Sequence, residues 1–131
     1  MRRSWIRAAA IATIAGLGWA GPAAAQSRPH VSAPPTITGS AVVGSTLTSV
    51  GGQAGGPPGT TVGRAWLRCT SPTREWSCAP IQGAGNTSTY TVRDADVGRY
   101  LRTALYAQRG RDRAWRMSPA TAAVTQPAPP A

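Results

Sequence analysis

The chain of 131 residues is poor in several residue types that catalytic and metal sites need. It contains no Lys and no Phe, a single His, two Cys and four acidic residues. The single His is His30, close to the start of the chain, so neither a Ser-His-Asp nor a Cys-His arrangement can form within a downstream domain. Two Cys and one distant His supply too few ligands for a metal site. We therefore expect a protein that is not an enzyme and that uses no cofactor or metal.

The few acidic residues also argue against carboxylate chemistry. Asp94 and Asp96 flank a tight turn, where Asp side chains normally accept hydrogen bonds from backbone N–H groups, and Glu75 and Asp112 fall in predicted loops. A glycosidase needs two carboxyl groups that face one sugar, and this distribution does not predict such a pair.

The shortage of acids leaves a strong positive charge, because all fourteen basic residues are Arg and the formal net charge is +10. Such a charge favours anionic partners if it gathers on one face of the protein. Abundant Ala, Gly and Pro together with absent Lys are, however, typical of proteins from GC-rich genomes. Part of the charge is then explained by codon bias, and both interpretations stay open.

The first 25 residues have the pattern of a secretory signal peptide. A basic start with Arg2, Arg3 and Arg7 precedes an uncharged apolar stretch over 8–20, and Ala23-Ala24-Ala25 offers small side chains to signal peptidase. The apolar run is shorter than the roughly 20 residues that span a bilayer, which disfavours a membrane anchor. We expect cleavage after Ala25 and a protein without a membrane span that is secreted or resides in the periplasm or cell envelope.

The export route stays open. Arg2-Arg3-Ser4-Trp5-Ile6-Arg7 loosely resembles the twin-arginine consensus, but Arg pairs also occur in ordinary signal peptides. The general secretory route is the favoured interpretation.

The rest of the chain predicts one all-β domain over 35–125, between a flexible lead over 26–34 and a disordered Pro- and Ala-rich tail over 126–131. Short runs of Thr, Val, Leu, Tyr and Trp alternate with turn residues, and the Gly-rich stretch 51–59 predicts a mobile connection. About seven short strands in this length are typical of an immunoglobulin-like β-sandwich. The expected strands are Thr36–Thr38, Ser45–Val50, Val62–Cys69, Ser77–Gln82, Ser88–Val92, Arg99–Ala107 and Ala114–Val124.

Several short motifs occur in a fixed order along this domain. They are Pro35-Thr36-Ile37-Thr38-Gly39, Val43-Gly44-Ser45-Thr46-Leu47-Thr48, Ala65-Trp66-Leu67-Arg68-Cys69, Cys78, Ile81-Gln82-Gly83-Ala84, Ser88-Thr89-Tyr90-Thr91-Val92 and Ala95-Asp96-Val97-Gly98-Arg99-Tyr100-Leu101-Arg102. In order and spacing they resemble the Ig-like repeats of secreted and surface proteins from high-GC bacteria. The resemblance implies an extracellular, non-enzymatic β module. Those repeats usually occur in tandem, whereas this chain has one copy, so a spacer role does not transfer.

The individual residues of the domain favour structural roles over catalytic or ligand-binding roles. Trp66 lies in the middle of a strand and is expected to be a buried indole. Asp96-Val97-Gly98-Arg99-Tyr100 resembles the tyrosine corner of Ig domains, in which the Tyr hydroxyl bonds to nearby backbone. Because side chains alternate along a strand, Leu101, Thr103 and Leu105 are the expected inward set.

The two cysteines predict a Cys69–Cys78 disulfide. An exported protein enters an oxidising compartment, and the eight residues between the thiols suit a link across adjacent strands.

The last two strands carry the densest positive charge. The candidate anion-binding residues are Arg99, Arg102, Arg109, Arg111, Arg113 and Arg116, close in sequence to Tyr100, Tyr106 and Trp115. We expect a recognition or structural module that contacts a protein, glycan or wall polymer outside the cell. The alternative is a polyanion-binding protein for acidic wall polymer, lipopolysaccharide or nucleic acid, of which nucleic acid is the least favoured.

Overall fold

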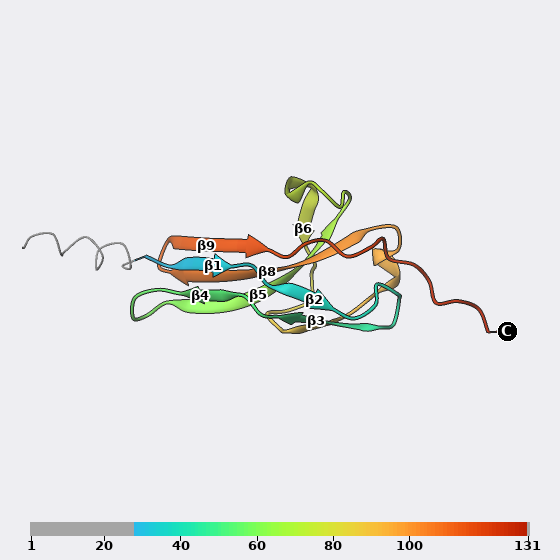
Figure 1. The fold of residues 1–131 in the computed structure, drawn as a ribbon, viewed down its shortest axis with the longest axis horizontal. Helices are drawn as coiled ribbons and strands as arrows, with labels where there is room; N and C mark the ends of the chain where they lie inside the picture. Colours follow the sequence, from blue (N-terminus) through green and yellow to red (C-terminus); the bar gives the residue numbers. More distant parts are fainter. Residues whose placement is uncertain (1–27, 131) are drawn as a thin grey trace, which may run out of the picture.

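The computed structural model describes residues 28–130, so the predicted signal peptide lies outside the described residues. Within them the chain forms nine strands and two short 3₁₀ turns, Glu75–Ser77 and Asp94–Asp96 (Figure 1). The all-β prediction is confirmed. The strands are β1 (His30–Ala33), β2 (Thr36–Thr38), β3 (Thr46–Val50), β4 (Gln53–Gly55), β5 (Thr61–Cys69), β6 (Cys78–Pro80), β7 (Thr89–Thr91), β8 (Tyr100–Arg109) and β9 (Asp112–Met117).

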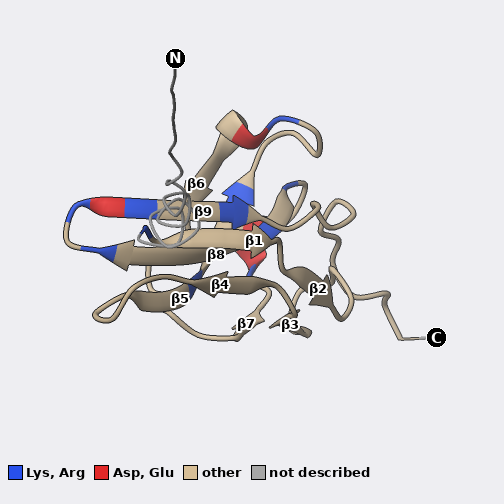
Figure 2. Ribbon diagram, turned by 60° about the vertical axis from the view of Figure 1, so that its left-hand side comes forward, with Lys and Arg blue, Asp and Glu red and all other residues tan. Residues whose placement is uncertain are grey.

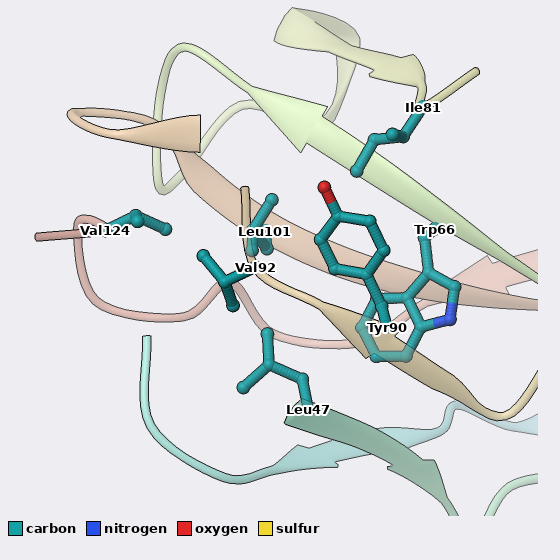
Figure 3. Packing of buried hydrophobic residues seen from close by; sticks show 7 residues of the cluster. All are labelled: Leu47, Trp66, Ile81, Tyr90, Val92, Leu101 and Val124. Carbon is teal, nitrogen blue, oxygen red and sulfur yellow. The ribbon is translucent and has the colours of Figure 1, made fainter. Parts of the chain in front are cut away.

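Two antiparallel sheets enclose the core. A four-stranded sheet has the order β6-β5-β8-β9, and a three-stranded sheet has the order β2-β3-β7. The core side chains come from both sheets and from the segments that join them, and they meet between the two layers (Figure 3). They are Leu47, Trp66, Ile81, Tyr90, Val92, Leu101 and Val124.

Trp66 and Tyr90 form the centre of this core. Their rings stack with centroids 5.6 Å apart, and the Trp66 indole N–H donates to the carbonyl oxygen of Thr87 at 3.0 Å. Trp66 is 1% exposed, so its predicted burial is confirmed. Burial of the Trp66 ring leaves no polar atom unsatisfied, because its indole N–H has a hydrogen-bond partner.

An additional two-stranded ribbon, β1 with β4, corrects two expectations from the sequence. Residues 30–33 of the predicted flexible lead form a strand, and so do residues 53–55 of the predicted mobile connection. The ribbon packs against β5, β8 and β9 (Figure 1). It continues the β2–β3 pair across a bend where Pro34 and Pro35, which cannot donate to a ladder, lie opposite Gly51 and Gly52. The residues that resemble a linker in the sequence form the bend of a long ribbon.

Gly52 is required at this bend. Its φ is +84°, and an added Cβ would lie 2.7 Å from Cδ2 of Leu105. A side chain here would be strained by the positive φ and would also crowd Leu105 and the backbone of Pro35 and Ala33.

A buried polar cluster joins the two sheets around Asp96, which is fully buried. Its carboxylate accepts from Arg68 Nε at 2.6 Å, from the Tyr90 hydroxyl at 2.6 Å and from the backbone N–H of Arg93 at 2.8 Å. The predicted capping role of Asp96 is confirmed. The tyrosine-corner prediction expected the Tyr100 hydroxyl to bond to nearby backbone. The hydroxyl that bonds at this corner instead belongs to Tyr90, and its acceptor is the Asp96 carboxylate. Burial and then the hydrogen bond to Asp96 raise the pKa of Tyr90 to about 12.

Strand β8 is buried on both faces. Leu101, Thr103 and Leu105 point inward as predicted, but Arg102 and Ala104 on the outward face are only 6% and 3% exposed. The cover comes from the β5–β6 connection, residues 70–77, because Arg102 Nη2 donates to the carbonyl oxygen of Pro72.

The predicted strand Ala114–Val124 is too long. Strand β9 ends at Met117, because Ser118 turns inward to exchange hydrogen bonds with Thr103 and Pro119 has no N–H for the ladder. The chain then crosses to the other layer, where Val124 and Thr125 form parallel bridges with Val97 and Val42.

Candidate binding groove

The outward face of the four-stranded sheet carries a groove of about 450 Å³, here called the Trp groove. One wall is the connection 70–77, the Trp76 loop, and the other wall is β9. The groove is lined by Ala65, Leu67, Glu75, Trp76, Cys78, Pro80, Ala104, Tyr106, Arg113, Trp115 and Met117. Most of these side chains are apolar and two of them are Trp.

The sheet surface is hollowed at the centre of the Trp groove because the side chains that meet there are small. Ala65 of β5 and Ala104 of β8 are directly opposite partners in the ladder, and Leu67 lies two residues further along β5. Side chains at alternate positions share one face of a sheet, so Ala104, Tyr106 and their partners Met117 and Trp115 line the same side. The hollow follows from this register.

The Trp76 loop is fixed at both ends. The Cys69–Cys78 disulfide, which confirms the prediction, joins residues that lie directly opposite on β5 and β6. Arg102 then holds the middle of the loop through the carbonyl of Pro72 at 2.8 Å. Trp76 is nevertheless 79% exposed, so the fold presents this indole to solvent on an anchored loop.

The β9 wall holds Trp115 over the same floor. Trp115 is 52% exposed and pairs with Tyr106. The Tyr106 ring lies across the sheet above Gly63, where an added Cβ would be 2.5 Å from the Tyr106 hydroxyl oxygen. Asn86 fixes the ring by donating to this hydroxyl at 3.0 Å.

Charge in the Trp groove is balanced. Glu75 and Arg113 are the charged residues of its lining. The guanidinium of Arg113 donates to Oε1 of Gln108 at 2.9 Å and lies 5.8 Å from the centre of the Tyr106 ring. The groove thus offers one carboxylate, one oriented guanidinium and several aromatic faces.

The predicted anion-binding arginines divide into three groups. Arg102 is buried, where Nη1 donates to the carbonyl of Ser118 at 2.9 Å and also lies 3.8 Å from Glu75. Arg102 is therefore a buried residue that holds neighbouring loops in place, and it does not belong to the exposed arginine surface. Arg99 is exposed but precedes β8, so about 30 Å of strand separates it from the hairpin turn at ~3.3 Å per residue.

The remaining four, here called the hairpin arginines, are exposed and all belong to the β8–β9 hairpin, along which Figure 2 shows several basic segments. They are Arg109, Arg111, Arg113 and Arg116. Arg109 donates to the carbonyl of Pro58 at 3.0 Å and Arg116 to that of Ser32 at 3.3 Å. These contacts leave part of each guanidinium available at the surface.

Two other hollows lack large aromatic walls. One of about 510 Å³ lies between the β1–β4 ribbon and the sheet beside His30, Gln53 and Arg64, and one of about 260 Å³ lies between β2 and 119–122. Across residues 28–130, no group of three or more His, Cys, Asp or Glu side chains is placed to hold a metal ion. Over the same range no helix is long and apolar enough to cross a membrane.

The sequence does not predict the Trp groove, although it contains part of the signal. Tyr106 and Trp115 are close in sequence to the predicted anion-binding arginines, and their alternation with Ala104 and Met117 indicates one shared face. Trp76 gave no periodic signal because it lies in a loop, and its place depends on the disulfide and on Arg102.

The comparisons with known proteins add no assignment to this geometry. No protein-family model matches the chain, and a search of curated proteins finds none similar to it.

Proposed function

We propose that this chain is a non-enzymatic, Ig-like recognition module that acts outside the cytoplasm and binds its partner through the Trp groove. The single observation that carries the proposal is the pair of solvent-exposed indoles, 79% and 52% exposed, on opposite walls of one hollow. Aromatic side chains of this size dominate the energetics of binding sites. Exposing two of them together is costly unless a partner covers them.

The compartment and the fold of the module are supported separately. A disulfide is typical of proteins in oxidising compartments. A three-stranded sheet β2-β3-β7 against a four-stranded sheet β6-β5-β8-β9 supports the Ig-like assignment. The partner class is a protein, glycan or wall polymer of the cell envelope.

Co-sedimentation with isolated bacterial envelope material tests this proposal. The parent chain should pellet with the envelope, and the double variant Trp76→Ala/Trp115→Ala should stay in the supernatant. Because neither indole is part of the buried core, the free energy of unfolding of the variant should stay within about 1 kcal/mol of that of the parent. Val62→Ala is the matched control, since Val62 is 47% exposed on the same sheet and lies outside the groove. Equal pelleting of parent and double variant would exclude the Trp groove as the recognition site.

A second candidate function is polyanion binding by the hairpin arginines. Four exposed guanidinium groups on one hairpin provide paired donors for phosphate, sulfate or carboxylate. Each contact to a phosphate releases counterions, so affinity should fall steeply with salt.

Elution from heparin measures this function. The variant Arg109→Ser/Arg111→Ser/Arg116→Ser leaves Arg113 in the Trp groove and should reduce the slope of log affinity against log salt by up to about 3. Arg99→Ser is the control from the far end of β8. A variant that elutes with the parent would exclude the hairpin as the polyanion site.

A further inference from the structure

We infer that the Trp groove binds an uncharged polysaccharide chain whose sugar rings stack on Trp76 and Trp115. This inference rests on the proposed recognition function and names the class of its ligand. It draws on the size of the groove, on the exposure of its aromatic walls and on its charge.

The size of the groove favours a small ligand or a slender chain over a second copy of this protein. Eleven residues line it and its volume is about 450 Å³. Stable protein interfaces use roughly 20–30 residues from each partner, whereas ligand sites measure about 300–1,000 Å³. A single chain of sugar rings matches this size.

The exposure of the walls favours a ligand with one apolar and one polar side. A wholly apolar ligand is normally enclosed, but the indole of Trp76 is 79% exposed. A hexopyranose ring with equatorial substituents presents flat C–H faces and carries its hydroxyl groups around the edge. Its C–H face can bury against an indole while its hydroxyl groups stay in water or reach polar side chains.

The charge of the groove favours an uncharged ligand. The described residues carry eleven Arg against four acids, yet the Trp groove contains one of each sign, Arg113 and Glu75. Glu75 lies 3.8 Å from Arg102 and its side chain is 63% exposed, so this acid offsets part of the positive charge near the groove and lowers the attraction for a polyanion. For a sugar, this carboxylate can accept a hydrogen bond from a ring hydroxyl, and Arg113 can donate one.

The apolar and the charged side chains of the groove are placed to suit the apolar faces and the polar edges of a sugar ring. Apolar side chains occupy the floor and both walls, and Glu75 directly precedes Trp76 on one wall. Arg113 lies two residues before Trp115 on the other wall and is held by Gln108. Each wall of the groove therefore carries one indole and one charged hydrogen-bonding side chain, and Arg74 also lies 5.8 Å from the centre of the Trp76 ring.

Calorimetric titration of the full-length chain with cellohexaose and chitohexaose tests the inference. Both are uncharged oligosaccharides with equatorial β-1,4 linkages. We expect binding of at least one of them that changes less than about twofold between ~0.05 and ~0.5 M NaCl, because no counterions are released. Trp76→Ala and Trp115→Ala should each weaken it about tenfold or more, as expected for loss of a stacking platform.

Matched variants separate stacking from mere loss of volume. Trp76→Tyr and Trp115→Tyr keep an aromatic face and should retain most of the affinity, whereas Val62→Ala should retain all of it. Glu75→Gln, which keeps the shape and removes the charge, should weaken sugar binding severalfold and should not create binding to oligo-dT.

The outcomes distinguish the ligand class from the function. Binding of oligo-dT or an apolar peptide that depends on both Trp residues, with no binding of either sugar, would overturn the saccharide inference and leave the recognition proposal intact. Sugar binding that is unchanged in both Ala variants would overturn the inference and place the site elsewhere. If no probe binds in a Trp-dependent way and the envelope pelleting is also independent of Trp76 and Trp115, the recognition proposal itself fails.

Discussion

The Cys69–Cys78 disulfide should contribute a large share of the stability of the domain and should also fix Trp76. The two residues lie opposite each other in the ladder, nine positions apart in sequence, and the chain between them is the Trp76 loop. Linking them removes loop-closure entropy from the unfolded chain. For a loop of this length the chain-entropy relation gives about 2.6 kcal/mol at 25 °C.

The perturbation is the double variant Cys69→Ala/Cys78→Ala, compared with the parent under reducing and oxidising conditions. We expect the free energy of unfolding to fall by about 2–3 kcal/mol on reduction, which corresponds to a melting temperature lower by about 10–20 °C for a domain of ~100 residues. Cys69 is fully buried, so the double variant should lose up to ~1 kcal/mol more through the missing sulfur. Denaturant unfolding monitored by circular dichroism measures both values.

Amide hydrogen exchange provides the local readout. The N–H groups of Thr70 and Ser77 donate within the Trp76 loop, to Ser77 and Arg74, and should exchange faster once the link is lost. If reduction costs less than ~1 kcal/mol and leaves these amides protected, then other contacts hold the loop and the reasoning from loop closure is wrong.

Three further substitutions test contacts that stabilise the fold. Arg102→Ala should lower the free energy of unfolding by about 2–4 kcal/mol in denaturant unfolding, because it removes charge-assisted hydrogen bonds to two carbonyls. In the same experiments Arg99→Ala, at an exposed position, should change it by less than ~0.5 kcal/mol. Gly52→Ala should cost about 1–3 kcal/mol, and Gly44→Ala, with φ +91° but open space around it, should cost less in parallel thermal melts. The pKa of Tyr90 is about 12 in the folded chain, against 10.0 for an ordinary Tyr. The unfolded chain therefore releases this proton first, so the contribution of Tyr90 to stability is fully present below pH 10.0 and is lost as the pH rises towards 12. Tyr90→Phe should flatten this loss in unfolding experiments across the same pH range, and an unchanged profile would contradict the assignment.

The long central strands could be predicted because their signal is local. Trp66 and Cys69 stand in a run of strand-forming residues, and Leu101, Thr103 and Leu105 alternate as a strand with one buried face requires. The inward or outward direction of these side chains follows from their pattern along each strand, which the sequence displays directly.

The bent ribbon and the role of Arg102 could not be predicted from local patterns. In the sequence, Pro34-Pro35 and Gly51-Gly52 each resemble part of a linker. They form the bend of the ribbon because they lie opposite each other in a ladder. Alternation along β8 assigns Arg102 to solvent, but the Trp76 loop covers that face from thirty residues away in sequence. Burial on an outward face depends on such long-range contacts and leaves no periodic signal.

The positive charge of the chain cannot be converted directly into ligand affinity, because the structure uses much of it internally. Arg64 donates to Ser49 and to the carbonyl of Gly51, Arg68 pairs with buried Asp96, and Arg102 fastens two loops. A guanidinium that is committed to a buried acceptor gains little from an added phosphate, so these residues should not contribute to salt-dependent binding. Of the hairpin arginines, Arg113 lines the charge-balanced Trp groove, whereas Arg109, Arg111 and Arg116 are exposed outside it. Ionic strength should therefore separate the two surfaces in one protein: raising the salt concentration should release a polyanion from the hairpin while an uncharged ligand stays in the groove.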